Sequence, residues 1–176
     1  MSKQLVLYIA CSVDGYIAKP NDDLSFLGLV EQPGEDYGYA AFMQTIDTVL
    51  IGRKTYDWVM KQVPEFPHAH LNTFVITRNP VPNQGNIQFY SGDITVLVKQ
   101  LKTQSGKNIF CDGGAEIVNL LLQADLIDEL IISVIPVLLG DGIRLFKDGR
   151  TELNLALIEV KHFEKGLVQL HYKRKI

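Results

Sequence analysis

Cysteine is scarce in this sequence, and so are positive charge, long hydrophobic runs and metal-binding patterns. Cys11 and Cys111 are its only cysteines, without metal-ligand spacing. Reduced, buried thiols are expected rather than a disulfide framework, although the sequence leaves a bridge between them open. The net charge of −3 argues against a general binder of nucleic acid or membrane surfaces. No apolar stretch reaches the ~18 residues that span a bilayer, and no secretory leader precedes the first predicted strand, so we expect a cytoplasmic protein.

Two nucleotide-binding fingerprints are also missing. The sequence contains neither Gly-x-Gly-x-x-Gly nor a Gly-x-x-x-x-Gly-Lys loop. Any anionic ligand must therefore be held by a local cluster of donors. Hydrophobic residues make up 47% of the sequence and charged residues 21%, which are ordinary globular values, and the length predicts a single domain over residues 1–176.

Apolar runs and turn residues predict β-α units first and strands alone afterwards. Strands are predicted over 5–10, 47–52, 73–77, 87–90 and 109–112, and helices over 36–46, 53–60, 94–101 and 115–124. Three more strands follow at 129–139, 156–163 and 167–173, the last pair joined by a hairpin turn at 164–166. This order predicts an α/β fold, a three-layer α/β/α sandwich whose mixed, mostly parallel central sheet ends in antiparallel C-terminal strands. The segment 19–35 is predicted to be a long irregular loop.

The most informative segment is Asn108-Ile-Phe-Cys-Asp-Gly-Gly-Ala-Glu116. A buried strand enters Gly113-Gly114, and a helix begins directly afterwards. The first backbone N–H groups of a helix have no intrahelical partner, and together with the helix dipole they favour a phosphate group. Glycine allows such a group to approach the backbone closely. The alternative is plain turn chemistry at a strand-to-helix connection.

A second strand-to-helix junction repeats this pattern. Gly52 ends a predicted strand, and Arg53, Lys54 and Thr55 then supply donors at a helix N-terminus. Two adjacent cations oppose the helix dipole there unless an anion lies between them and the backbone amides; the alternative is a solvated surface pair. Thr77-Arg78 ends the next strand, and ligands of open α/β sheets collect at the carboxyl ends of strands.

Four motifs resemble the dihydrofolate reductase fold in their order and spacing: Ile9–Ala18, Val49–Tyr56, Phe74–Arg78 and Ile109–Gly114. Three further motifs are similar to one branch of that fold, the reductase domain of the bifunctional riboflavin-biosynthesis deaminase-reductase: Ala124–Leu130, Pro136–Gly142 and Leu145-Phe146. The resemblance covers nearly the whole chain. The zinc-binding deaminase half and its His/Cys ligand pattern are missing, so we expect a stand-alone reductase.

The resemblance implies that NADPH binds across the sheet edge. A guanidinium can hold a phosphate with two hydrogen bonds, so Arg53 is the expected contact of the 2′-phosphate. The implied cofactor-binding residues are Gly113, Gly114, Ala115 and Glu116 under the pyrophosphate, Gly52, Arg53, Lys54, Thr55, Thr77 and Arg78 on the adenosine side, and Ala10 with Ile17 or Ala18 at the nicotinamide carboxamide. For the small and apolar members of this set, simple strand packing is the alternative.

The implied activity is an NADPH-dependent reduction of a heterocyclic or ribosylaminopyrimidine-type substrate, similar to 5-amino-6-(5-phosphoribosylamino)uracil reductase and thus to riboflavin biosynthesis. Dihydrofolate or pterin reduction is one alternative, and a non-catalytic nucleotide-binding protein that keeps the fold is another. Asp36 falls in the register of the carboxylate that grips the pterin ring in folate reductases, although the surrounding segment departs from their pattern. Asp36 could equally be a carboxylate at a helix start. The branch also implies a homodimer formed through residues 131–137 and 155–163.

Three other polar residues are given structural roles. Asp14 is expected to shape the Asp14-Gly15 turn rather than touch substrate. His68 and His70 are expected in a solvated loop, because their spacing completes neither a metal site nor a nucleophile relay.

Overall fold

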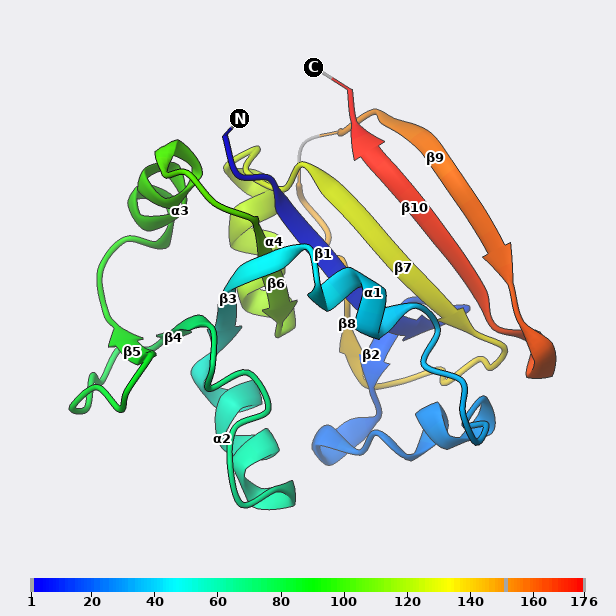
Figure 1. Cartoon of the computed structure of the whole chain (residues 1–176). Helices are drawn as coiled ribbons and strands as arrows, with labels where there is room; N and C mark the ends of the chain where they lie inside the picture. The colour runs from blue at the N-terminus through cyan, green and yellow to red at the C-terminus, as the bar shows by residue number, and fades with distance from the viewer. Residues whose placement is uncertain (1, 151, 176) are drawn as a thin grey trace.

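A computed structural model describes residues 2–150 and 152–175. Its centre is an eight-stranded sheet with the strand order β5-β4-β3-β6-β1-β7-β10-β9 (Figure 1). The strands of this sheet are β1 (Leu5–Ser12), β3 (Ile46–Gly52), β4 (Asn72–Ile76), β5 (Ile87–Tyr90), β6 (Asn108–Gly113), β7 (Glu129–Ile135), β9 (Leu155–His162) and β10 (Val168–Arg174). A separate two-stranded sheet joins β2 (Tyr16–Ala18) to β8 (Ile143–Arg144).

The sheet is parallel from β5 to β7 and antiparallel beyond β7. β1 lies between β6 and β7 and pairs with both in parallel, whereas β10 pairs antiparallel with β7 and with β9. The turn η3 (Glu164–Gly166) connects β9 to β10, as the sequence predicts. The mixed, mostly parallel sheet with antiparallel C-terminal strands is therefore confirmed.

Helices cover both faces of the parallel part. The helices are α1 (Tyr39–Met43), α2 (Arg53–Gln62), α3 (Ile94–Thr103) and α4 (Ala115–Gln123). α3 and α4 bury Val98 and Leu121 against one face, in the apolar cluster that also holds Leu7 of β1. On the other face, α1 buries Phe42 in a cluster with Phe110, and α2 buries Tyr56 beside β4 and β5. The predicted three-layer arrangement is confirmed for this part of the molecule.

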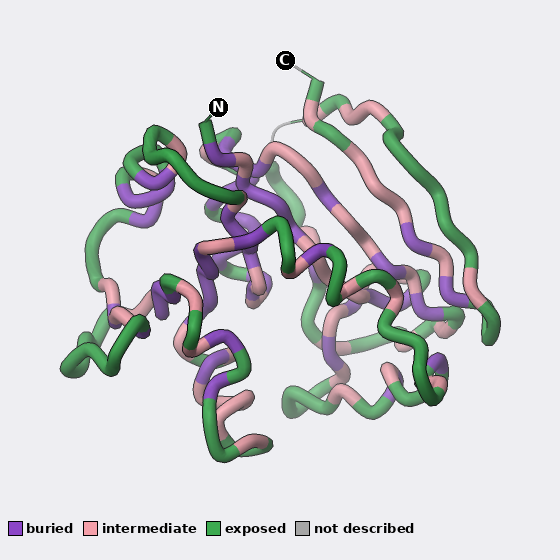
Figure 2. The backbone as a smooth tube through the Cα atoms, in the orientation of Figure 1, coloured by how far each residue is buried: buried purple, intermediate pink, exposed green. Residues whose placement is uncertain are grey.

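The antiparallel end is much more exposed. Residues 157–162 of β9 are all exposed, so this strand lacks the cover that the parallel strands have (Figure 2). Leu157, Ile158 and Val160 are its large apolar side chains, and each is about half exposed.

Two predicted elements are too long. The helix expected over 36–46 is only α1, because Gly38 adopts the left-handed conformation just before it and Ile46 already belongs to β3. The strand expected over 129–139 ends at Ile135, followed by Pro136, since proline lacks the N–H that would continue a strand ladder.

The segment 19–35 forms two short 3-10 helices, η1 (Pro20–Asp22) and η2 (Ser25–Leu29), within the expected irregular path. Across the described residues, every helix is too short or too polar to cross a membrane.

Candidate active site

The two strand-to-helix junctions lie side by side at the carboxyl edge of the parallel strands. β3 pairs with β6, and Ile51 lies opposite Gly113. A Cβ atom added to Gly52 would lie 3.4 Å from the amide nitrogen of Gly114, and one added to Gly114 would lie 3.0 Å from Oγ1 of Thr55. The two junctions therefore pack closely, and a side chain in place of either glycine would crowd the other junction; we call this narrow meeting point of Gly52, Gly113 and Gly114 the glycine crevice.

Both helices that start in this crevice have open N-termini. α2 begins after Gly52 and α4 after Gly114, and neither start is capped by a side-chain hydrogen bond. α3 shows the contrast, because Asp93 accepts hydrogen bonds from the amides of Thr95 and Val96 at its start. The uncapped amides of α2 and α4 can bind an anion, as their dipoles also favour.

The cations of the second junction are placed differently from one another. Arg53 is half-buried, its Nε lies 2.8 Å from Oδ1 of Asp57, and its guanidinium lies 5.3 Å from the ring centre of Phe89. The carboxylate of Asp57 therefore pairs with Arg53, one of the two adjacent cations. Lys54 is exposed, and Arg78 is exposed beyond the end of β4.

The remaining predicted cofactor residues lie around the same edge. Thr77 follows Ile76, which pairs with Gly52 across β3 and β4. Ala115 is buried in the first turn of α4, whereas Glu116 is exposed and lies 3.7 Å from Lys147. Ile17 packs against the apolar cluster that contains Ile117 of α4.

Ala10 and Ala18 are the other two members of that set. Ala10 lines the cavity described below. Ala18 is buried in β2, where it pairs with Ile143.

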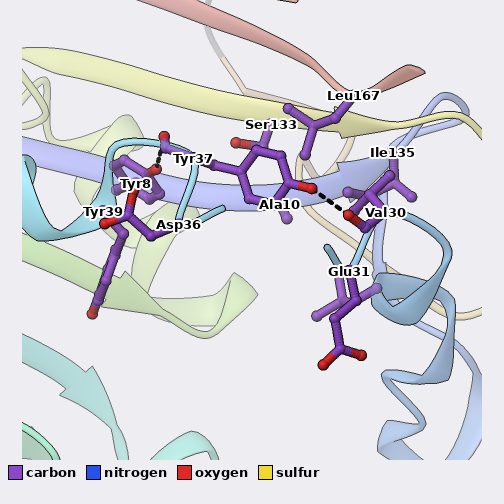
Figure 3. A pocket seen from close by; sticks show the side chains of 11 residues that line it. Tyr8, Ala10, Val30, Glu31, Asp36, Tyr37, Tyr39, Ser133, Ile135 and Leu167 are labelled. Carbon is purple, nitrogen blue, oxygen red and sulfur yellow. Dashed lines mark hydrogen bonds between the residues drawn. The ribbon is translucent and has the colours of Figure 1, made fainter. Parts of the chain in front are cut away.

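A cavity of about 270 Å³ opens beside β1, on the sheet face that carries α1 (Figure 3). Its floor comes from β1 and β7, and its walls come from η2, the segment before α1 and the start of β10. The lining residues are Tyr8, Ala10, Leu27, Val30, Glu31, Asp36, Tyr37, Tyr39, Ser133, Ile135 and Leu167.

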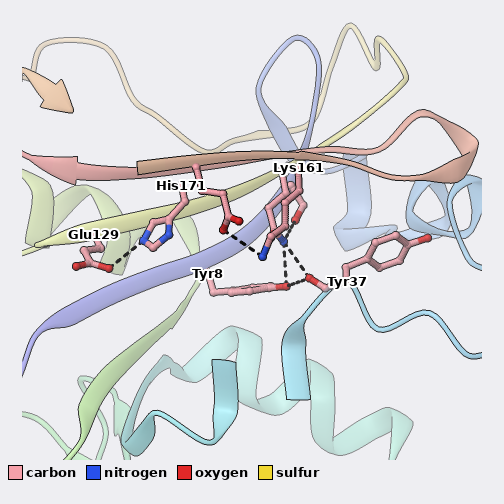
Figure 4. Close-up of polar contacts among 8 residues, drawn as sticks. Tyr8, Tyr37, Glu129, Lys161 and His171 are labelled. Atoms are coloured by element: carbon pink, nitrogen blue, oxygen red, sulfur yellow. Dashed lines mark hydrogen bonds and ion pairs between the residues drawn. The ribbon is translucent and has the colours of Figure 1, made fainter. Parts of the chain in front are cut away.

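A hydrogen-bond network fixes the polar groups of the cavity floor (Figure 4). The Tyr8 hydroxyl donates to the Tyr37 carbonyl at 2.9 Å. Nε2 of Gln169 lies 3.1 Å from the Tyr8 hydroxyl, 3.2 Å from the Tyr37 carbonyl and 3.1 Å from Oγ of Ser133. Gln169 therefore holds β1, β7 and the segment before α1 together beneath the cavity.

Asp36 lies in the cavity wall, and both of its carboxylate oxygens accept backbone hydrogen bonds. Oδ2 accepts from the Ala40 amide and Oδ1 from the Gly38 amide, each at 2.9 Å. The hydrogen bond from Ala40, then that from Gly38, lowers the pKa of Asp36 below its ordinary value. Asp36 is thus an ionised acceptor at neutral pH, and each oxygen keeps a further lone pair for a ligand.

Asp112 is a second carboxyl group at the same edge. It occupies the residue before Gly113 on β6, one position beyond the Leu7–Cys111 pair, and its charge acts on the hydroxyl of Tyr39. Burial raises the pKa of Asp112 to about 6, and among the described residues no charge or hydrogen bond offsets that shift. Close to neutral pH, Asp112 can therefore both hold and release a proton.

Tyr39 connects the cavity to His68. The Tyr39 hydroxyl lies 3.0 Å from Nε2 of His68, and its pKa is raised by burial and, to a smaller extent, by the charge of Asp112. His68 is 9% exposed and lies among the rings of Phe66, Phe110 and Tyr39. The expectation of a solvated His68 is therefore wrong, because the loop carrying it folds back onto the aromatic cluster under α1.

Asp14 has the structural role that the sequence predicts. Its carboxylate accepts hydrogen bonds from the Ser12 hydroxyl and from the amides of Leu139 and Gly140. These bonds, chiefly the one from Ser12, lower the pKa of Asp14 to about 2. Asp14 thus ties the turn after β1 to the loop that follows β7.

The two cysteines are free and buried. Burial raises the pKa of Cys11 to about 11 and that of Cys111 to about 12, so both are protonated thiols at neutral pH. Within residues 2–150 and 152–175, no group of three or more His, Cys, Asp or Glu side chains is placed to hold a metal ion.

The family model for the RibD C-terminal domain matches residues 3–169. The chain belongs to this family. The Bacillus subtilis (strain 168) protein YwjB is 43% identical over 99% of both chains. The crystal structure of a putative riboflavin biosynthesis protein from Shewanella sp. PV-4 matches all of both chains with a TM-score of 0.87 and 31% identity. A 2,5-diamino-6-ribosylamino-4(3H)-pyrimidinone 5′-phosphate reductase from Debaryomyces hansenii is 37% identical over 42% of this chain and 29% of its own length.

In this RibD C-terminal domain, sequence reasoning missed most of the cavity. Tyr8, Ser133 and Gln169 lie in strands that were treated as structural, and nothing local marks them as neighbours. Asp112 had a visible signal, because alternation along β6 places it on the face opposite Cys111 and directly before the glycine pair. A charged residue in a strand that is otherwise apolar is unusual enough to be examined as a site.

Proposed function

We propose that this protein is an NADPH-dependent reductase of a heterocyclic substrate, with the ribosylaminopyrimidine class as the leading candidate. Membership of the RibD C-terminal domain family supports reductase chemistry. The observation that carries the proposal is the narrow crevice in which two uncapped helix starts meet across Gly52, Gly113 and Gly114.

The donors at these two helix starts suit the phosphates of a dinucleotide. The amides at the starts of α2 and α4 hold the phosphates, and the guanidinium of Arg53, kept in place by Asp57, contacts the 2′-phosphate. Ala10 and Ile17 or Ala18 hold the nicotinamide end, next to the cavity. When bound, NADPH supplies the hydride.

The cavity beside Ala10 positions the substrate. Asp36 is an ionised acceptor that orients N–H groups of the ring, the role that the sequence suggests for it. Asp112, with a pKa of about 6, is the proposed source of the proton: the hydride adds to C1′ of the ribosylamino group, the bond from C1′ to the ribose ring oxygen breaks, and that oxygen takes up the proton. The two carboxyl groups therefore have different roles, because their environments shift the pKa values in opposite directions.

Cofactor binding tests this proposal directly. NADPH at 100 times its dissociation constant is expected to stabilise the protein by ~2.7 kcal/mol in thermal unfolding. With a ribosylaminopyrimidine or pterin present, absorbance at about 340 nm should fall as NADPH is consumed. No stabilisation at millimolar NADPH would refute the proposal, and stabilisation without turnover on any heterocycle would favour a non-catalytic nucleotide-binding protein.

The proposed assembly is a homodimer formed through the antiparallel end of the sheet. The apolar side chains of Leu157 and Val160 are 56% and 52% exposed on β9, which favours burial against a second copy. Light scattering coupled to size exclusion should give twice the mass of one chain, and Val160→Lys should lower it. A monomer at micromolar concentration would contradict the dimer and leave the reductase proposal intact.

A further inference from the structure

We propose that the cavity takes an amino-substituted nitrogen heterocycle without a phosphate or carboxylate group. This inference rests on the proposed function, because it assigns the substrate class of the same site. It sets this protein apart from the Debaryomyces hansenii reductase, whose name specifies a 5′-phosphate.

The charges that line the cavity are negative. Asp36 and Glu31 lie on two sides of it (Figure 3), and no arginine or lysine is among its lining residues within the part of the chain that the structure describes. Asp36 is ionised at neutral pH because its pKa is lowered. Both carboxylates belong to exposed residues, so solvent screens their repulsion of a phosphate, but no lining side chain among the described residues supplies a positive charge to offset it.

Three basic side chains near the cavity already have partners. Lys165 donates a hydrogen bond to the main-chain carbonyl of Glu31. Lys161 lies 3.1 Å from Glu159, and His171 lies 2.9 Å from Glu129, both on the same face of the sheet (Figure 4). Recruiting Lys161 or His171 to a phosphate would break a contact that the protein makes within itself, whereas Lys165 has further N–H groups but is held at the main chain of Glu31.

The size of the cavity also favours a small ligand. Pockets for drug-sized ligands occupy ~300–1,000 Å³, so about 270 Å³ suits a ring system with one substituent of the size of a sugar. Its acceptors are the Asp36 and Glu31 carboxylates, and its aromatic walls are Tyr8, Tyr37 and Tyr39. Carboxylates accept the N–H groups of an amino-substituted ring, and tyrosine rings contact its faces.

The test uses two compounds that differ only in the phosphate, 5-amino-6-ribosylaminouracil and its 5′-phosphate. Their dissociation constants are measured by calorimetry on protein saturated with NADP⁺ and on cofactor-free protein, so the preference is measured even where the cofactor does not bind. We expect the compound without phosphate to bind at least ~10-fold more tightly. Equal or tighter binding of the phosphorylated compound would overturn the inference, and so would no detectable binding of either.

A matched pair of variants locates the effect. Glu31→Lys supplies a cation to the cavity and should reduce the discrimination against phosphate by ~10-fold. Glu65→Lys makes the same charge change on an exposed residue that does not line the cavity and should leave the discrimination unchanged. Equal shifts in both variants, each checked for folding by thermal unfolding, would show a long-range charge effect and overturn the assignment to the cavity.

Failure of this inference and failure of the proposed function are distinguishable. Loss of NADPH binding would refute the reductase without affecting the measured preference between the two compounds. A preference for phosphate in a protein that binds and oxidises NADPH would refute the substrate class alone.

Discussion

The glycine crevice and the neighbouring cavity are built in different ways. The crevice is made of backbone: two helix starts and three glycines, in two continuous segments of the chain. The cavity is made of side chains that come from β1, η2, the segment before α1, β7 and the start of β10. Backbone amides suit the phosphates that every dinucleotide carries, whereas side chains from separate segments can change one at a time. Under the proposed function, changes to the side chains of the cavity would alter the substrate and leave the contacts to the cofactor in place.

The largest expected effect is on the catalytic rate, through Asp112, which lies on β6 directly before Gly113. Asp112→Asn should lower kcat ~10²–10⁴-fold, the contribution of a general acid. In the unsubstituted protein, kcat/KM should fall as the pH rises above about 6, the pKa of Asp112, because the acid form donates the proton. Steady-state rates between pH 5 and 9 measure both effects.

The same variant should stabilise the fold at neutral pH. The pKa of Asp112 is raised, so the folded protein binds more protons than the unfolded chain between roughly pH 4 and 6, and its stability falls as the pH rises through that window. At pH 7.5, Asp112→Asn should therefore increase the free energy of unfolding by ~1–2 kcal/mol, measured in urea. Asp148→Asn, an exposed carboxylate, is the control. An unchanged rate in Asp112→Asn would remove Asp112 from the mechanism.

The next prediction tests whether the backbone amides beside Gly114 hold the phosphates of NADPH. Gly114→Ala places a methyl group 3.0 Å from Oγ1 of Thr55, so it crowds the contact between the two junctions. We expect NADPH affinity to fall ~10-fold or more, measured by fluorescence titration. Gly28→Ala meets no atom within 4 Å and should leave the affinity unchanged. Equal affinities in the two variants would contradict the placement of the pyrophosphate.

A smaller and more selective effect is expected at Arg53. Arg53→Ala should weaken NADPH ~10-fold while leaving NADH nearly unchanged, because only NADPH carries the 2′-phosphate. Lys61→Ala, at the other end of α2, removes a positive charge far from the helix start and is the control. A similar loss of affinity for both cofactors would show that Arg53 stabilises the helix start and does not contact the 2′-phosphate.

The smallest effect concerns the support of the cavity. Gln169→Met removes the hydrogen bonds that Nε2 makes to the Tyr8 hydroxyl, the Tyr37 carbonyl and the Ser133 hydroxyl, so the free energy of unfolding should fall by ~1–2 kcal/mol. The substrate KM should rise, while cofactor affinity stays the same. Gln100→Met, exposed on α3, should change neither, and a loss of cofactor affinity in Gln169→Met would mean that the two regions are not independent.

The sequence predicts the two regions to different extents for a physical reason. Each glycine junction is local, so its strand, its turn and its helix start can be recognised within ten residues of sequence. That the two junctions lie side by side follows only from the pairing of β3 with β6. The cavity depends on which strands become neighbours, and Tyr8, Ser133 and Gln169 meet only after β1, β7 and β10 have paired. The helix expected over 36–46 failed for a similar reason, because its ends are set by Gly38 and by the start of β3 rather than by apolar spacing.

The position of β1 in the sheet has a consequence for folding during synthesis on the ribosome. β1 is the first strand to be synthesised, yet its two neighbours, β6 and β7, begin only at Asn108 and Glu129. At ~5–20 residues per second, the ribosome needs about 5–20 s to produce the first of these partners. Throughout that interval, the apolar segment Leu5–Leu7 has no lateral neighbour to pair with. The centre of the parallel sheet can therefore close only after Glu129 and the rest of β7 have left the ribosome.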